Sequence, residues 1–322
     1  MVDNHEFTRM MDTSDEWIRS HTGIQTRYIA DGESAWELGL GAAEDAMRGS
    51  SIRPQEVGMV ICSTSSPDYF TPSTASIIAG KLGVKDAICF DLNAACSGGL
   101  FGMDVASLYI GSGRVKYALL VAAEKVSKFL DYTDRSTCVL FGDGAGAVVF
   151  GPSERGGIIS TYLAGDNTGY DMLVAPVNAP PTPFETKKPP ALIENENAYL
   201  RMAGKGVYKF AVRAGAEAID EVLKKAGRKV DDVRWFVPHQ ANLRIIDSIS
   251  ERYGLNKDRV FVSIDKNANT SSSSILIAID QLNKNGQLRD GDLLLMLVFG
   301  AGLTYGAMLY EWRECNDQDQ VM

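Results

Sequence analysis

The sequence predicts an α/β fold whose strands are covered by helices on both faces, and two observations carry this prediction. Apolar runs of strand length, rich in β-branched residues, alternate along the chain with segments of helical periodicity. Each half also closes with paired strands around a glycine-rich turn, at residues 141–146 in the first half and at residues 299–302 in the second. The shared pattern indicates an internal duplication.

The elements follow one another in a regular order. In the first half we expect strands at 57–66, 87–93, 117–124 and 138–150, and helices at 34–49, 74–82 and 98–111. In the second half we expect helices at 206–226 and 243–253 and strands at 233–238, 260–264 and 293–299. The apolar character of residues 87–93 predicts a buried strand.

The predicted halves are joined by a proline-rich segment. Six of the eleven prolines lie between residues 172 and 199, which predicts a long surface loop that acts either as a lid or as a plain linker. The predicted organisation is therefore a first half at 1–171, a connecting loop at 172–199 and a second half at 200–322.

The composition excludes several classes of function. The chain has 322 residues, of which 45% are hydrophobic, and a net charge of −9, which argues against nucleic acid as a partner. No run approaches the roughly 18 apolar residues of a membrane span and the N-terminus does not resemble a signal peptide, so we expect a cytoplasmic protein with no membrane association. The five cysteines form no CxxC pair, which predicts neither a metal site nor a disulfide.

Cys96 stands between a predicted strand and the long apolar helix that follows it. The N-terminus of a helix lowers the pKa of a thiol, which favours a nucleophile at this position. A lone cysteine in an apolar stretch is more often a small packed residue, so its neighbourhood alone leaves both interpretations open.

Two polar residues follow predicted strands of the second half. His239 lies just past the strand at 233–238, at the sheet edge where α/β proteins hold ligands, and is the candidate general acid or base. Asn269 follows the strand at 260–264 and opens a helix, where an asparagine is more often a cap than a catalytic group. The glycine-rich turn at 299–302 brings backbone N–H groups close enough to bind an oxyanion.

Together with Cys96, a series of motifs closely resembles one family, the β-ketoacyl-acyl carrier protein synthases III of the thiolase-like superfamily. The resemblance covers nearly the whole chain, and its landmarks in order are residues 12–18, 22–24, 134–135, 141–146, 202–204, 238–244 and 269–271. It implies a five-layered αβαβα fold of two similar halves and a homodimer that meets around residues 87–93 and a neighbouring helix.

The resemblance also implies the reaction. An acyl group passes from coenzyme A to Cys96, and malonyl-acyl carrier protein then loses carbon dioxide and attacks this thioester to give 3-oxoacyl-acyl carrier protein, which initiates fatty-acid synthesis. His239 and Asn269 would donate to the enolate oxygen, while the backbone N–H groups of Cys96 and Ala301 would hold the acyl oxyanion. Neither a metal nor a cofactor is implied, because coenzyme A and the phosphopantetheine of the carrier protein enter as parts of the substrates.

Further residues are assigned to binding by the resemblance. Coenzyme A would contact Trp17, Arg135, Gly204, Tyr208 and Asn242. The acidic carrier protein would dock on a basic patch made of Lys209, Arg213 and Arg244.

The chain departs from the family pattern in four places. His21 stands where an arginine is common, and Ala301 replaces the middle glycine of a triple-glycine turn, where a Cβ disfavours positive φ. Thr71 stands where many members have a phenylalanine that lines the acyl pocket across the dimer, which predicts primers longer or more branched than acetyl. The family's first strand, which we expect at the centre of the first sheet, has no counterpart before Val2, and we expect that translation begins upstream.

Two other functions remain open at this point. One is a specialised-metabolism ketosynthase or acyltransferase of the same fold, which would use Cys96 with a different acceptor. The other is a catalytically silent partner in a dimer, although the presence of Cys96, His239 and Asn269 argues against that function.

Overall fold

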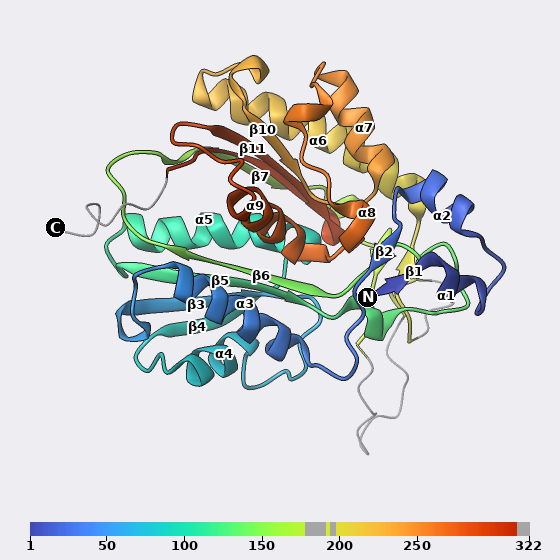
Figure 1. Cartoon of the computed structure of the whole chain (residues 1–322), viewed down its shortest axis with the longest axis horizontal. Helices are drawn as coiled ribbons and strands as arrows, with labels where there is room; N and C mark the ends of the chain where they lie inside the picture. Colours follow the sequence, from blue (N-terminus) through green and yellow to red (C-terminus); the bar gives the residue numbers. More distant parts are fainter. Residues whose placement is uncertain (178–190, 194–197, 314–322) are drawn as a thin grey trace.

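The computed structural model describes residues 1–177, 191–193 and 198–313. Two four-stranded sheets lie face to face, with helices between them and on both outer sides (Figure 1). From bottom to top of Figure 1 the helical layers are α3 (Ala35–Gly49) with α4 (Thr74–Leu82), α5 (Gly98–Gly111) with α9 (Ser274–Lys284), and α6 (Gly204–Ala226) with α7 (Leu243–Arg252). The predicted five-layered αβαβα fold is confirmed.

The first sheet has the order β4-β3-β5-β6, formed by β4 (Ile88–Leu92), β3 (Val57–Ser63), β5 (Tyr117–Glu124) and β6 (Gly144–Phe150). Alternate residues of β3 pack on opposite sides of the sheet, Met59 and Ile61 against the middle layer and Val60 and Cys62 against α3 and α4. The prediction of a buried strand at 87–93 is wrong, because β4 is an edge strand and Ile88 is 44% exposed.

The second sheet has the order β10-β11-β12-β7, formed by β10 (Trp235–Pro238), β11 (Leu293–Gly300), β12 (Thr304–Glu311) and β7 (Gly157–Gly165). The strand predicted at 260–264 is absent, since only Val260 bridges to β10 and Ile264 begins a short helix, α8 (Ile264–Asn267). The N–H groups of Ser263 and Ile264 instead donate to the side-chain Oε1 of Gln240. A side-chain amide therefore replaces the strand ladder at this point.

The two sheets repeat one arrangement, which supports the predicted duplication. In the first, β3 is parallel to β5 and β5 is antiparallel to β6; in the second, β10 is parallel to β11 and β11 is antiparallel to β12. The expectation that the family's first strand belongs at the centre of the first sheet is wrong, because the four strands of this sheet are hydrogen-bonded in unbroken succession. The strand predicted at 138–150 begins only at Gly144, after a turn at residues 134–143.

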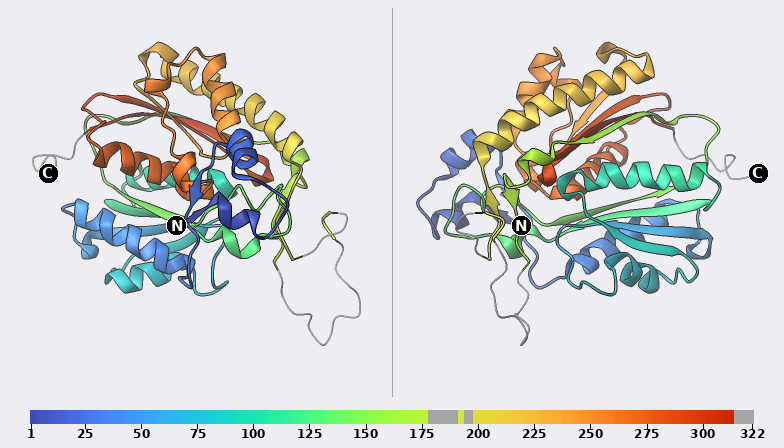
Figure 2. Two further views of the ribbon diagram at one scale, coloured as in Figure 1. Left: turned by 45° about the vertical axis from the view of Figure 1, so that its right-hand side comes forward. Right: turned by 180° about the vertical axis from the view of Figure 1, so that it is seen from behind.

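The middle layer supplies the largest core. Seen from behind, α5 lies along the gap between the sheets (Figure 2). Its Leu100 and Met103 pack with Met59 of β3 and with Leu294 and Met296 of β11, so the two halves share one apolar cluster. This shared core places the carboxyl ends of β4 and β10 on the same side of the molecule.

Short elements complete the end of the molecule that carries the N-terminus. They are β1 (Val2–Asp3), α1 (Asn4–Thr8), α2 (Asp15–Thr22), β2 (Thr26–Arg27), β8 (Leu173–Val174) and β9 (Arg201–Met202). The pairing of β8 with β9 joins the two ends of the predicted proline-rich connection, most of which lies outside the described residues. None of the helices within the described ranges has the length and apolar composition of a membrane span.

Candidate active site

One cavity of about 590 Å³ reaches from the surface to Cys96. Its lining includes His239, which follows β10, and Asn269, which follows α8. The structure therefore brings the three residues proposed for catalysis to one place from three separate loops.

Cys96 lies in a single 3-10 turn, Ala95–Ser97, between the end of β4 and the start of α5. Ala95 before it has a φ of 46°, a left-handed conformation that is costly for a residue with a Cβ. The backbone of Gly300 packs against the same turn, since a Cβ at Gly300 would lie 2.8 Å from the backbone nitrogen of Cys96. The position of the thiol is thus fixed by a strained turn, and Gly300 packs so closely against this turn that no side chain would fit between them.

The expected lowering of the Cys96 pKa by the helix N-terminus is wrong. Burial raises the pKa of this thiol to about 11, because the charged thiolate is penalised where water is excluded. A hydrogen bond with Ser271 acts in the opposite direction but is the smaller effect. The thiol therefore carries its proton at neutral pH until a substrate reacts with it.

His239 is 1% exposed, and burial lowers the pKa of its imidazole to about 3. Its Nδ1 lies 2.6 Å from Oγ of Ser274, and the ring meets Phe299 edge-on with 5.4 Å between ring centroids. If the Ser274 hydroxyl donates to Nδ1, the ring hydrogen sits on Nε2. His239 is then a neutral hydrogen-bond donor to a substrate oxygen.

Asn269 is held in a strained turn. Ala268 before it has a φ of 55° and Ser271 after it a φ of 52°, and Oδ1 of Asn269 accepts the N–H of Ser271 at 2.8 Å. Its own N–H donates to the carbonyl of Leu140. Because Oδ1 is engaged, the Nδ2 group is the part of the amide available to donate to a substrate.

The turn after β11 differs from the expected oxyanion site in its details. Positive φ occurs at Gly302, at 129°, and Ala301 has none, so its Cβ adds no backbone strain. Gly300 lines the cavity beside Cys96, whereas Ala301 is outside its lining. Binding of an acyl oxyanion by Ala301 stays a prediction.

The outer end of the cavity carries aromatic and cationic groups. The guanidinium carbon of Arg135 lies 4.9 Å from the centroid of the Trp17 ring, and His21 stacks on Trp17 at 4.4 Å between centroids. The side-chain amide of Asn242 donates to the carbonyl of His21 at 3.1 Å, which ties α2 to the start of α7. Gly204 and Tyr208 also line the cavity, so all five residues predicted to contact coenzyme A lie along it.

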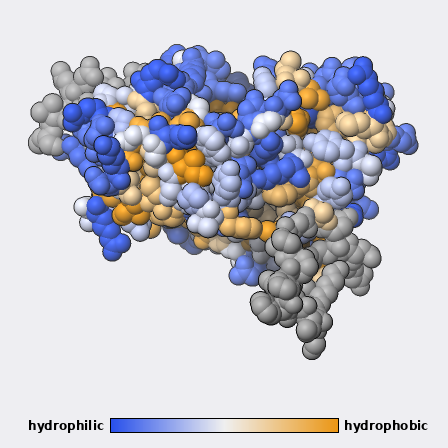
Figure 3. Space-filling view, turned by 90° about the horizontal axis from the view of Figure 1, so that it is seen from below, coloured by the Kyte–Doolittle hydropathy of each residue, from blue (hydrophilic) through white to orange (hydrophobic). Residues whose placement is uncertain are grey.

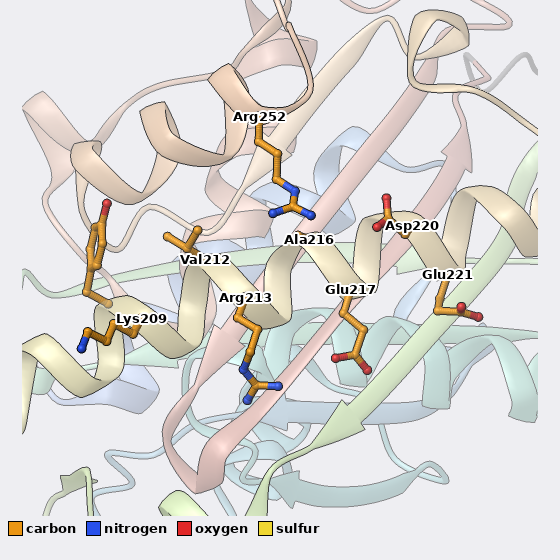
Figure 4. A pocket seen from close by; sticks show the side chains of 9 residues that line it. Lys209, Val212, Arg213, Ala216, Glu217, Asp220, Glu221 and Arg252 are labelled. Carbon is orange, nitrogen blue, oxygen red and sulfur yellow. The ribbon is translucent and has the colours of Figure 1, made fainter.

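The predicted docking residues have unequal surroundings. Arg213 pairs with Asp166 at 2.9 Å, and Arg244 donates to the carbonyl of Ser20 at the end of α2. Lys209 lies where the cavity adjoins a shallow groove of about 700 Å³ between α6 and α7. Along α6 the groove changes from basic side chains near Lys209 to the acidic residues Glu217, Asp220 and Glu221 (Figure 4).

Thr71 lies outside the cavity lining, on an exposed loop beside Phe70, which is 80% exposed. Its predicted contact with an acyl group across a dimer stays a prediction.

Sequence reasoning missed a buried acid behind the thiol. Glu124 ends β5, is 0% exposed and accepts hydrogen bonds from residues that include Ser271 and Ser272. One signal was available in the sequence, where Glu124 directly follows seven apolar residues of a predicted strand. A carboxyl group in such a position is costly to bury, which marks it as a candidate for a specific role. Metal-ligating clusters of His, Cys, Asp and Glu do not occur among the described residues.

Comparisons with known proteins agree with this geometry. Residues 90–167 match the family model "3-Oxoacyl-[acyl-carrier-protein (ACP)] synthase III", and residues 223–312 match the model of its C-terminal part. A β-ketoacyl-[acyl-carrier-protein] synthase III of Clostridium acetobutylicum is 43% identical over 312 residues, which are 97% of this chain and 94% of the relative.

Solved structures give the same result. The crystal structure of 3-oxoacyl-[acyl-carrier-protein] synthase III from Aquifex aeolicus superposes with a TM-score of 0.89 and 40% identity over 97% of this chain and 95% of that one. A synthase III from Thermus thermophilus also gives a TM-score of 0.89 and 40% identity, over 98% of this chain and 96% of that one. The chain therefore belongs to the β-ketoacyl-acyl carrier protein synthase III family, the condensing acyltransferases that initiate fatty-acid synthesis.

Proposed function

We propose that this chain transfers an acyl group from coenzyme A to Cys96 and condenses it with malonyl-acyl carrier protein. The observation that carries the proposal is the cavity, which joins a nucleophile and two neutral hydrogen-bond donors at its inner end to an aromatic and cationic mouth. A thioester fits such a passage, with the nucleotide at Trp17 and Arg135 and the acyl carbon at Cys96.

The proposed roles follow from the charges at the site. Loss of carbon dioxide from the malonyl group leaves a carbanion stabilised as an enolate, whose oxygen gains negative charge. Neutral His239 and the Nδ2 group of Asn269 would donate to this oxygen in a cavity from which water is largely excluded. The electrons of the new carbon–carbon bond come from the broken carbon–carboxylate bond, so the reaction needs no cofactor.

The proposed carrier-protein site includes fewer of the predicted basic residues than the sequence indicated. Lys209 is the predicted basic residue best placed for the phosphopantetheine entrance, because Arg213 and Arg244 already have partners within the chain. The acidic residues farther along α6 would repel an acidic carrier protein. We therefore place docking at the Lys209 end of the groove.

We further propose a homodimer formed across the edge of β4. This strand has a hydrogen-bonded neighbour on one side only, and its Ile88 is exposed. The first N–H groups of α4 donate to Asp91 of β4, and the loop that leads into α4 carries the exposed Tyr69 and Phe70. Seen from below, the face of the α3 and α4 layer carries apolar areas between hydrophilic ones (Figure 3). Phe70→Asp should shift the protein from dimer to monomer in gel filtration with light scattering, and an unchanged dimer would contradict this interface.

One assay tests the reaction. The protein is incubated with a panel of acyl-CoA primers and malonyl-acyl carrier protein, and both acyl-enzyme and 3-oxoacyl product are followed by mass spectrometry. Product with at least one primer is expected, with longer or branched primers accepted if Thr71 widens the acyl pocket. Acyl-enzyme without product would favour an acyltransferase, and neither species from a folded protein would favour the silent partner. The cytoplasmic location stays a prediction.

A further inference from the structure

A chain of hydrogen bonds leads from Cys96 to the buried carboxyl group of Glu124. Oγ of Ser271 lies 3.5 Å from Sγ of Cys96 and 3.0 Å from Oε1 of Glu124. The three groups come from the turn before α5, the turn before α9 and the end of β5, so only the folded chain brings them together.

The Glu124 carboxyl is surrounded by donors and not by cations. Oε2 accepts from the N–H and hydroxyl of Ser65 and from the hydroxyl of Ser66, and Oε1 accepts from the hydroxyls of Ser271 and Ser272. No ion pair to Glu124 occurs within the described ranges. Such a cage satisfies an ionised carboxylate, yet burial raises its pKa, so it also has an appreciable affinity for a proton.

The direction of the hydrogen bonds follows from the donor count. A serine hydroxyl has one hydrogen, so Ser271 cannot donate to Sγ and to Oε1 at once. While Cys96 is a thiol and Glu124 a carboxylate, Ser271 donates to Glu124 and its oxygen is free to accept from the thiol. When Cys96 is a thiolate and Glu124 is protonated, both bonds can reverse with no heavy atom moving.

We propose that Glu124, acting through the hydroxyl of Ser271, accepts the proton of Cys96 when the thiol attacks the acyl-CoA. The S–H bond breaks as an O–H bond forms on Ser271, whose own hydrogen passes to Oε1 of Glu124. The new S–C bond forms as the coenzyme A sulfur leaves with its electron pair. In the condensation Cys96 leaves as a thiolate and recovers the proton from Glu124 by the same route, so the cycle closes.

The other groups near the thiol are less suited to this task. His239 has its pKa lowered to about 3 by burial and its Nδ1 faces Ser274, so it is a weak acceptor for a thiol proton. The left-handed φ of Ser271, 52°, is a conformation that glycine would adopt without strain, but glycine has no hydroxyl to bridge the two groups.

Other titratable groups surround Glu124 and could shape a pH profile. From β5 and the turn after it come Lys125, whose ammonium donates to the carbonyl of Glu33, and Lys128, which lies 3.7 Å from Asp68. From the neighbouring strands and loops come the buried thiol of Cys62 and the carboxyl groups of Asp91 and Asp143, which accept backbone N–H groups. These groups stay in place in the variants below, so differences between variants report on Glu124 and Ser271.

The proposal is tested by the pH dependence of Cys96 reactivity. Acyl-enzyme formation from acetyl-CoA without carrier protein is measured in single turnovers from about pH 6 to about pH 9.5. Glu124→Gln and Ser271→Ala should react on the order of a hundredfold more slowly than wild type near neutral pH, with a rate that rises about tenfold per pH unit as thiolate forms unaided. Glu124→Asp, which retains a carboxylate, should recover part of the rate.

The matched control is Ser272→Ala. It removes a 2.7 Å hydrogen bond to the same Oε1 atom but no contact with Cys96, so it should keep the wild-type pH profile. If Glu124 acted only as a nearby negative charge, Glu124→Gln would lower the Cys96 pKa and speed the reaction near neutral pH, which would overturn the proposal. Equal effects of Ser271→Ala and Ser272→Ala would overturn it too, even if Glu124→Gln fails to fold.

This inference rests on the proposed acyl transfer to Cys96. A second reagent distinguishes a failure of the proton route from a failure of the acyl transfer. Alkylation of Cys96 by iodoacetamide, located by peptide mapping, needs no acyl-CoA and should show the same order of variants. If the wild type forms no acyl-enzyme but the wild type and variants are alkylated in this order of rates, the proposed function alone is contradicted. Alkylation with one pH profile in all variants would contradict the proton route alone.

Discussion

Burial of His239 makes the stability of the fold depend on pH in a specific way. The folded imidazole has its pKa lowered from 6.5 to about 3, because the charged ring would lie in a site that excludes water. The unfolded chain takes up a proton on His239 below about pH 6.5, and the folded chain does not. Acid therefore stabilises the unfolded state. The free energy of unfolding falls progressively as the pH falls from 6.5 towards 3, because only the unfolded chain binds the proton in this range.

The size of this effect can be worked out for one pH. At about pH 5 the unfolded imidazole is almost fully protonated, which removes about 2 kcal/mol from the free energy of unfolding relative to neutral pH. His239→Asn has no titrating group at this position, so the wild type should lose about 2 kcal/mol more than the variant between pH 7 and pH 5. Urea unfolding followed by circular dichroism at both pH values measures this difference. Equal losses in the two proteins would refute a neutral, buried His239.

Three further results are expected. Asn269→Asp keeps the acceptor for the Ser271 N–H but loses the Nδ2 donor. It should slow condensation, measured with preformed acyl-enzyme, by about a hundredfold or more, and a loss below about tenfold would count against the donor role. Trp17→Ala should raise KM for acyl-CoA about tenfold with little change in kcat, whereas His21→Ala, which leaves the indole in place, should have the smaller effect in the same steady-state assay. Lys209→Ala should raise KM for malonyl-acyl carrier protein alone, while Arg244→Ala should raise KM for acyl-CoA because it releases the end of α2; the reverse pattern would contradict the docking site.

Local sequence predicted the elements best where a run of apolar residues has clear ends. The strand at Tyr117–Glu124 and the helices at Thr74–Leu82 and Gly98–Gly111 match their predicted bounds. The strand predicted at 260–264 failed because of a residue outside the segment, since two of its N–H groups, those of Ser263 and Ile264, donate to the side chain of Gln240. Periodicity carries no information about such a partner.

The candidate site divides in the same way. Cys96, His239 and Asn269 became candidates because each follows a predicted strand, but the catalytic roles of Cys96 and Asn269 came from the family resemblance, and the strand predicted before Asn269 is absent. The structure places all three residues around one cavity. The pKa of Cys96 could not be predicted, because the burial that raises it depends on segments distant in the sequence. Glu124 was missed for the same reason, since its serine partners come from the loop after β3 and from the turn before α9.

The turn after β11 also bears on which sequence changes this site can accept. At Gly300 any side chain would collide with the backbone of Cys96, so the position is closed to substitution. At Ala301 the chain already has a methyl group, with no positive φ to oppose it. Gly302 has a φ of 129°, which a residue with a Cβ rarely adopts, so the middle position is the one in this turn where a side chain adds neither a collision nor backbone strain.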